Sequence, residues 1–167
     1  MTDTTPEFDQ VASLPTVNEG TVTPEFIDLN GHMNILHYLD HLAWGADTIC
    51  SNAGIDVEYR QQRRMGVFAA EHHLNYYREL REGEKFSVHV RPVERTDKAL
   101  HLVALLLDRT NDRLACTLET ILVHVDLDTR RATPIPTDIA TDLNREFAAY
   151  ADVNWPAPVC GAMRLRN

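Results

Sequence analysis

The sequence predicts an α+β domain in which a mainly antiparallel sheet packs against one long helix. An amphipathic run over residues 35–53 repeats its apolar positions at helical spacing. From residue 67 onward the pattern changes to successive β-rich segments, and the turns between them are too short for helical crossovers. The length of 167 residues and the hydrophobic fraction of 44% are enough for one core but not for two. We therefore expect one domain whose sequential strands run antiparallel.

The first part of the chain is expected to be irregular up to the long helix. Residues 1–20 mix Thr, Pro, Glu, Asp and Asn without periodicity, which predicts a flexible N-terminal arm. The helix is expected to follow a short extended run and to end at Gly54, because glycine is a favourable C-cap residue. Its apolar positions gather on one side: Ile35, Leu39, Leu42, Ala43, Ala46, Ile49 and Cys50. Residues 58–66, rich in Arg and Gln, are expected to connect the helix to the sheet.

Four long strands are expected after this connector, at about 67–77, 85–93, 100–107 and 114–125. Pro92 cannot donate to a strand ladder, so it implies a sheet edge or a bulge. The main domain then covers residues 21–136, and residues 137–167 form a C-terminal helix followed by an irregular tail. One helix cannot cover such a sheet, so we expect a homodimer or homotetramer with sites at the subunit interface.

The turn that enters the long helix carries the strongest functional pattern. Asp28 closes the extended run, Gly31 permits a sharp turn and Asn34 stands where a helix N-cap would stand. The helix start near Ile35 offers unpaired N–H groups and the positive end of the helix dipole to an oxygen that becomes negative during a reaction. Asp28 can act there as a general base or as a carboxylate nucleophile, and Asn34, besides capping the helix, is expected to have a supporting role in the site. The alternative is that Asp28 and Asn34 only cap a turn and a helix.

The pattern Asp28-x-x-Gly31-His-Met-Asn34, followed by Tyr38, resembles the hotdog-fold thioesterases of the 4-hydroxybenzoyl-CoA thioesterase type. The similarity extends over about residues 21–136. The resemblance implies a sheet wrapped around a central helix and an acyl-CoA substrate hydrolysed to free acid and CoA. It also implies that Asp28 is the catalytic carboxylate and that the helix-start amide at Ile35 polarises the thioester. It leaves open whether Asp28 acts as base or nucleophile.

Within that group, short segments of the sequence most resemble those of the betainyl-CoA thioesterase branch, which includes the domain fused to carnitine dehydrogenases. The similar segments are DLNGHMN at 28–34, TILVHVD at 120–126 and Pro-Ile-Pro at 134–136. This branch implies a short acyl group that carries a trimethylammonium. Such a cation cannot donate a hydrogen bond, so we expect it to be held by aromatic faces and a nearby carboxylate.

Further site candidates follow from their positions on the expected elements. His32 could orient Asp28 or touch the substrate, or be hydrogen-bonded within the turn. Glu71 is the candidate second carboxylate, and a solvated strand face is its alternative. The expected substrate-binding residues, each of which could instead serve packing or the surface, are Gly31, Tyr38, Phe68, His73, Tyr76, Tyr77, Arg63 and Arg64.

Composition excludes several other classes. The net charge of -9 argues against nucleic acid as a partner. No apolar run is long enough to span a bilayer, and the first residues lack the order of a secretion signal, so we expect a cytoplasmic protein without a membrane partner. His37 and His41 have a spacing that can hold zinc, but no third ligand is evident. We predict no metal and no cofactor.

The leading hypothesis is therefore a thioester hydrolase that acts on a short-chain acyl-CoA, with betainyl-CoA as the candidate substrate. A non-catalytic acyl-CoA-binding hotdog module would keep the pocket but have no use for an acid aimed at the carbonyl. A thioesterase for an aromatic acyl-CoA would use the same rings. A hotdog hydratase fits the order of the motif poorly.

Overall fold

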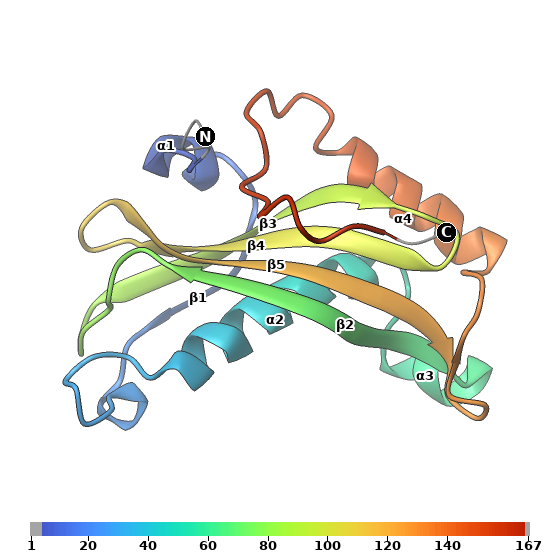
Figure 1. The fold of residues 1–167 in the computed structure, drawn as a ribbon, viewed down its shortest axis with the longest axis horizontal. Helices are drawn as coiled ribbons and strands as arrows, with labels where there is room; N and C mark the ends of the chain where they lie inside the picture. Colours follow the sequence, from blue (N-terminus) through green and yellow to red (C-terminus); the bar gives the residue numbers. More distant parts are fainter. Residues whose placement is uncertain (1–4, 166–167) are drawn as a thin grey trace.

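The computed structural model describes residues 5–165 and forms one antiparallel sheet curled around a central helix (Figure 1). The elements are α1 (Phe8–Ala12), β1 (Thr16–Thr21), η1 (Pro24–Phe26), α2 (Ile35–Asn52), α3 (Val57–Arg63), β2 (Met65–Tyr76), β3 (Lys85–Arg95), β4 (Ala99–Asp108), β5 (Arg113–Asp126), β6 (Arg131–Ala132) and α4 (Thr137–Ala148). The strand order is β1-β3-β4-β5-β2, and β6 pairs with β5. This is the α+β arrangement that the sequence predicts. Among the described residues, no helix is long and apolar enough to cross a membrane.

Helix α2 begins and ends where local chemistry predicts. Asn34 is the N-cap, and its side chain accepts a hydrogen bond from Leu36 N–H at 2.9 Å. Past the other end, Gly54 adopts a φ of +89°, which lets the last turn close on the helix carbonyls. The helix buries its face against β3, β4 and β5. A Cβ at Gly45 would lie only 2.6 Å from Val88 Cγ1, so the helix crosses the sheet at close range.

The buried face of α2 is rotated relative to the sequence-based expectation. Tyr38 does not belong to the predicted apolar face, yet it is only 3% exposed. Ile35 belongs to that predicted face, yet it is 59% exposed. Apolar periodicity alone does not separate a core position from an exposed one at the first turn of a helix. Ile35 stands at the mouth of a cavity described below, and this position explains its exposure.

From residue 5 onward, the N-terminal segment corrects the expectation of an irregular arm, and residues 1–4 of that arm lie outside the described residues. Residues Phe8–Ala12 form a short helix, and Thr16–Thr21 form β1, which pairs antiparallel with the start of β3. The contact is close, because a Cβ at Gly20 would lie 2.7 Å from Phe86 Cζ. Pairing with β3 is a long-range interaction that this Gly- and Asn-containing segment does not reveal by its own periodicity.

Strand β3 shows why Pro92 is tolerated. The register with β4 shifts between Pro92 and Glu94, so a bulge lies there. Strand β1 pairs only with the Lys85–His89 end of β3, which leaves Pro92 on an unpaired edge. The proline prediction is confirmed on both counts.

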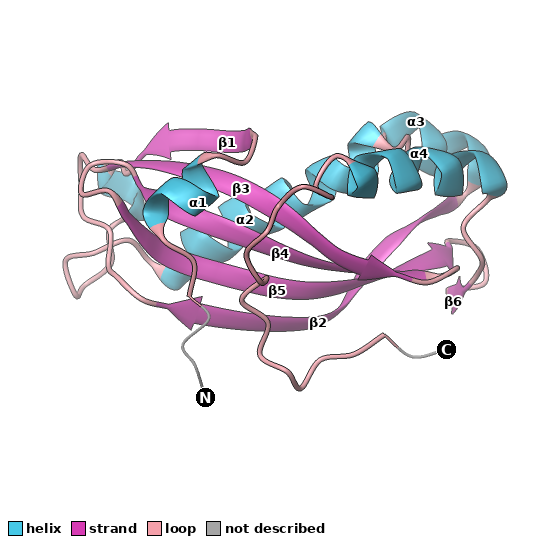
Figure 2. Ribbon diagram, turned by 90° about the horizontal axis from the view of Figure 1, so that it is seen from above, coloured by secondary structure: helices cyan, strands magenta, loops and turns pink. Residues whose placement is uncertain are grey.

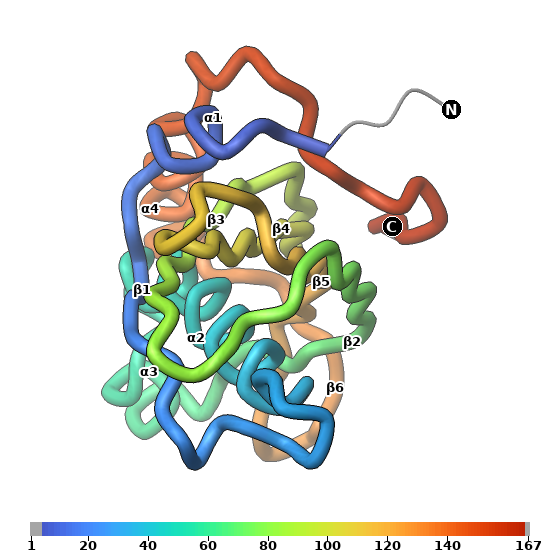
Figure 3. Tube along the Cα trace, turned by 90° about the vertical axis from the view of Figure 1, so that its left-hand side faces the viewer, coloured from blue at the N-terminus to red at the C-terminus, as the bar shows by residue number. Residues whose placement is uncertain are grey.

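The two faces of the sheet are covered differently. The concave face holds α2, whereas α1 and the segment after α4 lie over the other face (Figures 2 and 3). Val11 of α1 and Trp155 of the C-terminal segment pack with Val103, Leu105 and the neighbouring outward side chains of the strands. The expected C-terminal helix is present as α4. The irregular tail that follows it crosses the outer face of the sheet up to residue 165, and residues 166–167 lie outside the described residues.

Candidate active site

The turn between η1 and α2 holds the Asp28 carboxylate in one orientation. Asp28 Oδ1 accepts a hydrogen bond from Asn30 N–H at 2.8 Å, and the Asn30 amide nitrogen lies 3.4 Å from Oδ2. Asp28 N–H donates to His32 O at 3.0 Å, and Gly31, at φ +81°, makes the turn possible. The carboxylate therefore sits on a tight loop anchored at both ends. Sequence reasoning does not single out Asn30. The tendency of an aspartate to accept a hydrogen bond from the backbone N–H two residues later is the signal that could have indicated it.

The start of α2 lies directly after this turn. Asn34 Oδ1 occupies Leu36 N–H, whereas Ile35 N–H makes no hydrogen bond within the described residues. A free first amide at the positive end of an 18-residue helix can donate to a carbonyl oxygen and favours negative charge on it. Asn34 thus has the capping role expected for it, and the Ile35 N–H is left available as a donor.

His32 lies between the turn and the cavity. Its Nδ1 is 3.2 Å from Met33 O and 3.9 Å from Asp28 Oδ1. The longer distance exceeds a hydrogen bond, so His32 does not orient Asp28 directly here. The ring is half-buried and faces the cavity, where it can touch a substrate.

A cavity of about 230 Å³ opens at the helix start. It is lined by His32, Met33, Ile35, Tyr38, Tyr76, Tyr77, Arg78 and Glu79. The structure thus gathers most of the expected aromatic residues beside the Asp28 turn. Sequence reasoning missed Met33, Arg78 and Glu79, since the latter two belong to the loop after β2 and no local pattern connects them to the turn.

The aromatic side chains of this cavity are held in place by specific contacts. The Tyr38 hydroxyl accepts a hydrogen bond from Leu80 N–H at 2.7 Å, and burial raises the pKa of Tyr38 to about 12. The rings of Tyr38 and Tyr76 meet edge to face, with centroids 5.5 Å apart. Tyr38 is therefore a neutral, fixed wall, and Tyr76, which is 49% exposed, forms the outer side.

The remaining expected residues lie elsewhere in the single chain. Arg63 pairs with Asp138 at 2.5 Å and Arg64 with Asp128 at 2.8 Å, both beyond the far end of α2, which is about 27 Å long at 1.5 Å per residue. Phe68 lies under the Arg130 guanidinium, 4.7 Å from its ring centroid. Glu71 and His73 are further along β2, and the chain by itself does not bring them to Asp28.

The histidine pair on α2 is also engaged separately. His37 stacks on Phe26 with centroids 4.1 Å apart, and His41 Nδ1 lies 3.0 Å from Asn18 Nδ2. Among the described residues, the pair does not belong to a group that could hold a metal ion.

Comparison with known proteins shows to which protein family the chain belongs. A family model described as the thioesterase-like superfamily matches residues 22–143 of the sequence. The chain belongs to this thioesterase-like superfamily. The hotdog fold and the thioester-hydrolase activity that the sequence implies are thereby confirmed.

Individual proteins and solved structures are also similar to this chain. The chain is 32% identical over 144 residues to the betainyl-CoA thioesterase of Pseudomonas aeruginosa, covering 86% of this chain and 89% of that protein. It is 29% identical over 120 residues to an L-carnitine dehydrogenase/betainyl-CoA thioesterase of Agrobacterium fabrum, covering 72% of this chain and 24% of that longer protein. A Staphylococcus aureus protein solved in complex with CoA superimposes with a TM-score of 0.80 at 26% identity, covering 89% and 94% of the two chains.

Proposed function

We propose that this thioester hydrolase acts on a short-chain acyl-CoA, with betainyl-CoA as substrate, and that Asp28 is its catalytic carboxylate. The observation that carries the proposal is the Asp28 carboxylate, fixed by Asn30 on the turn that leads into the free Ile35 N–H of α2. The similarity to betainyl-CoA thioesterases supports the choice of acyl group.

The chemistry follows from this arrangement. The thioester oxygen accepts a hydrogen bond from Ile35 N–H, and the helix dipole stabilises the charge that develops on it. Asp28 either takes a proton from the water that attacks the carbonyl carbon or attacks that carbon itself, forming an anhydride that water then hydrolyses. The carbon–sulfur bond breaks and CoA leaves as a thiolate, which needs little help because the pKa of such a thiol is roughly 8.5. The products are the free acid and CoA.

The acyl group is proposed to occupy the cavity lined by Tyr38, Tyr76 and Tyr77. Aromatic faces attract a quaternary ammonium, which has no hydrogen to donate. Glu79 lines the same cavity, and its Oε1 also accepts from Arg81 Nε at 2.9 Å. Within one chain, we assign to Glu79 the role of the nearby carboxylate, for which the sequence offers Glu71 as the candidate.

The proposal includes a homodimer formed through the free edge of β2. Within the described residues this 12-residue strand pairs with β5 on one side only. An exposed edge of this length is a template for a second strand. Antiparallel pairing of two β2 strands about a two-fold axis places the Arg63–Phe68 region of the second copy beside Tyr76 of the first. Arg63, Arg64 and Phe68 can then serve a site to which their own chain does not bring them, and a homotetramer requires only further contacts between dimers.

Exposed apolar side chains on α2 support burial by a second copy. Leu36 and Trp44 are each 66% exposed on the side of the helix that the sheet leaves uncovered.

Because CoA esters are made and used inside cells, the proposed substrate also implies a cytoplasmic enzyme.

The test compares thioesters that differ in one property of the acyl group. Release of CoA thiol is measured for betainyl-CoA, for 3,3-dimethylbutyryl-CoA, in which carbon replaces the ammonium nitrogen, and for benzoyl-CoA. A cation held by aromatic faces is worth about 0.5–2 kcal/mol, so we expect kcat/KM for betainyl-CoA to exceed that for the neutral analogue by about tenfold. Equal rates for these two would overturn the betainyl assignment, and a preference for benzoyl-CoA would favour the aromatic alternative. No steady release from any of the thioesters would leave only a binding module.

A further inference from the structure

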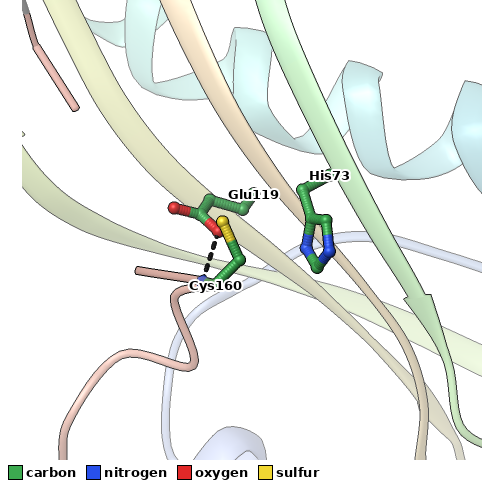
Figure 4. A group of neighbouring side chains, drawn as sticks. All are labelled: His73, Glu119 and Cys160. Atoms are coloured by element: carbon green, nitrogen blue, oxygen red, sulfur yellow. Dashed lines mark hydrogen bonds between the residues drawn. The ribbon is translucent and has the colours of Figure 1, made fainter. Parts of the chain in front are cut away.

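We propose that the outer face of the sheet carries a Zn²⁺ site formed by His73 of β2, Glu119 of β5 and Cys160 of the C-terminal segment. One possible ligand atom from each residue lies within 4.8 Å of the other two (Figure 4). Imidazole nitrogen, carboxylate oxygen and thiolate sulfur are the ligand types that Zn²⁺ takes in proteins. The site is separate from the Asp28 turn, which lies at the start of the helix on the other face of the sheet.

The first two ligands are fixed by the strand register. His73 stands directly opposite Glu119 in the β2–β5 ladder, so both side chains leave the same face of the sheet. The neighbours of Glu119, Leu118 and Thr120, face α2 instead, where they line the cleft beside that helix. The His73 and Glu119 side chains therefore meet on the outer face without any loop rearrangement.

Glu119 has the surroundings of an oriented metal ligand. Its side chain is only 1% exposed, which is unusual for a glutamate. Its Oε1 lies 2.8 Å from His101 Nε2, and its Oε2 accepts a hydrogen bond from Cys160 N–H at 2.7 Å. A buried carboxylate costs free energy unless it is paired, and metal-binding carboxylates are commonly held by such hydrogen bonds. His101 would be this supporting partner.

The third ligand arrives on the C-terminal segment. The bond from Cys160 N–H to Glu119 holds the backbone of this segment at the sheet, and Figure 4 shows the thiol beside the carboxylate. With zinc bonds of about 2.0–2.3 Å, ligand atoms in a tetrahedron lie about 3.5 Å apart. The separations of up to 4.8 Å must therefore shorten by about one ångström, and the half-buried Cys160, on a segment outside helix and strand, can supply this movement. Water would complete the fourth position.

Such an ion would fasten the C-terminal segment across the sheet. Trp155, five residues before Cys160, packs in the outer apolar cluster, and the guanidinium of Arg91 lies 4.4 Å from its ring centroid. A bond through Cys160 would add a second point of attachment. The role is structural: binding of the ion to the folded chain alone raises the stability of the fold.

The experiment measures metal binding and not hydrolysis, so its outcome is independent of the proposed substrate. The full chain is freed of metal with a chelator and titrated with Zn²⁺ against a chromophoric competitor. We expect one ion per chain, an increase in Tm on binding, and a thiolate-to-metal charge-transfer band when Co²⁺ replaces Zn²⁺. His73→Asn and Cys160→Ser should each weaken binding by at least a hundredfold and remove the increase in Tm.

Matched controls separate the site from general effects. His72→Asn alters the neighbouring residue of β2, which lines the cleft on the α2 side, and Cys116→Ser alters a thiol that is fully buried in the core. Both should retain the ion. The metal-free Tm of each variant shows whether it folds. Absence of binding in the parent chain, a Co²⁺ spectrum without the thiolate band, or equal binding in His73→Asn and His72→Asn would overturn the proposal and leave a hydrogen-bonded attachment only.

Discussion

Replacement of Asp28 by Asn removes the negative charge of the proposed catalytic carboxylate while keeping an oxygen for Asn30 N–H. The structural cost is small, because the affected interaction is one hydrogen bond of 2.8 Å on a loop, worth about 0.5–1.5 kcal/mol. For a chain of 167 residues this corresponds to a decrease in Tm of roughly 1–6 °C. The catalytic cost is far larger, since loss of a general base or nucleophile lowers turnover by about 10²–10⁴.

The assay is the steady release of CoA thiol from an acyl-CoA, measured beside thermal unfolding of the same sample. Asp142→Asn is the matched control: it also removes one carboxylate charge, from an i,i+3 ion pair with Arg145 on α4, and should keep full activity. The two variants together separate charge at the site from net charge. Turnover by Asp28→Asn within a few fold of the parent would refute the catalytic role of this carboxylate, whatever the effect on Tm.

Further outcomes follow from other parts of the structure. Replacement of Gly45 by Val should lower the free energy of unfolding by about 1–3 kcal/mol in urea titrations, since its Cβ would lie 2.6 Å from Val88 Cγ1; an unchanged midpoint would contradict this packing. Burial lowers the pKa of His89 in the folded state, so its neutral form is favoured and stability should be complete above the unfolded pKa of about 6.5 and decrease as the pH falls below it. A His89→Gln variant should show a weaker decrease between pH 7.5 and 5.5, and a slope equal to that of the parent would contradict the assignment. Tyr76→Leu should reduce kcat/KM for betainyl-CoA by about 3- to 30-fold and for 3,3-dimethylbutyryl-CoA by less; equal losses would indicate that the ring contributes packing alone. Light scattering should give at least twice the chain mass of 19.0 kDa, and a fully active monomer would refute the interface at β2.

The exposed edge of β2 connects several of these expectations. In the proposed dimer, residues that one chain holds at opposite ends of α2 come together along this strand. Arg63 and Arg64 are expected to bind the substrate, and their guanidinium groups are suited to the phosphates of CoA. They already pair with Asp138 and Asp128, so contact with these phosphates would require exchange of partners. Such exchange is feasible because both ion pairs are exposed and therefore weak.

The sequence alone determined the elements whose signals are local. The N-cap at Asn34, the Gly54 end of α2 and the four long strands were all predictable, because capping chemistry, glycine at positive φ and β-rich segments between turns act over a few residues. The Asp28 turn was predictable for the same reason, since its acid, glycine and cap lie within seven consecutive positions of the chain.

Only the tertiary structure decided what depends on contacts between distant residues. Strand β1 exists because β3 offers it a partner, and the rotation of α2 is set by the close passage of Gly45 over Val88. Arg78 and Glu79 enter the cavity through a loop, and Glu119 meets Cys160 across 41 positions of sequence. Local sequence patterns do not predict contacts between residues that are far apart in the sequence, because sheet register and the path of a terminal segment are set by packing of the whole core.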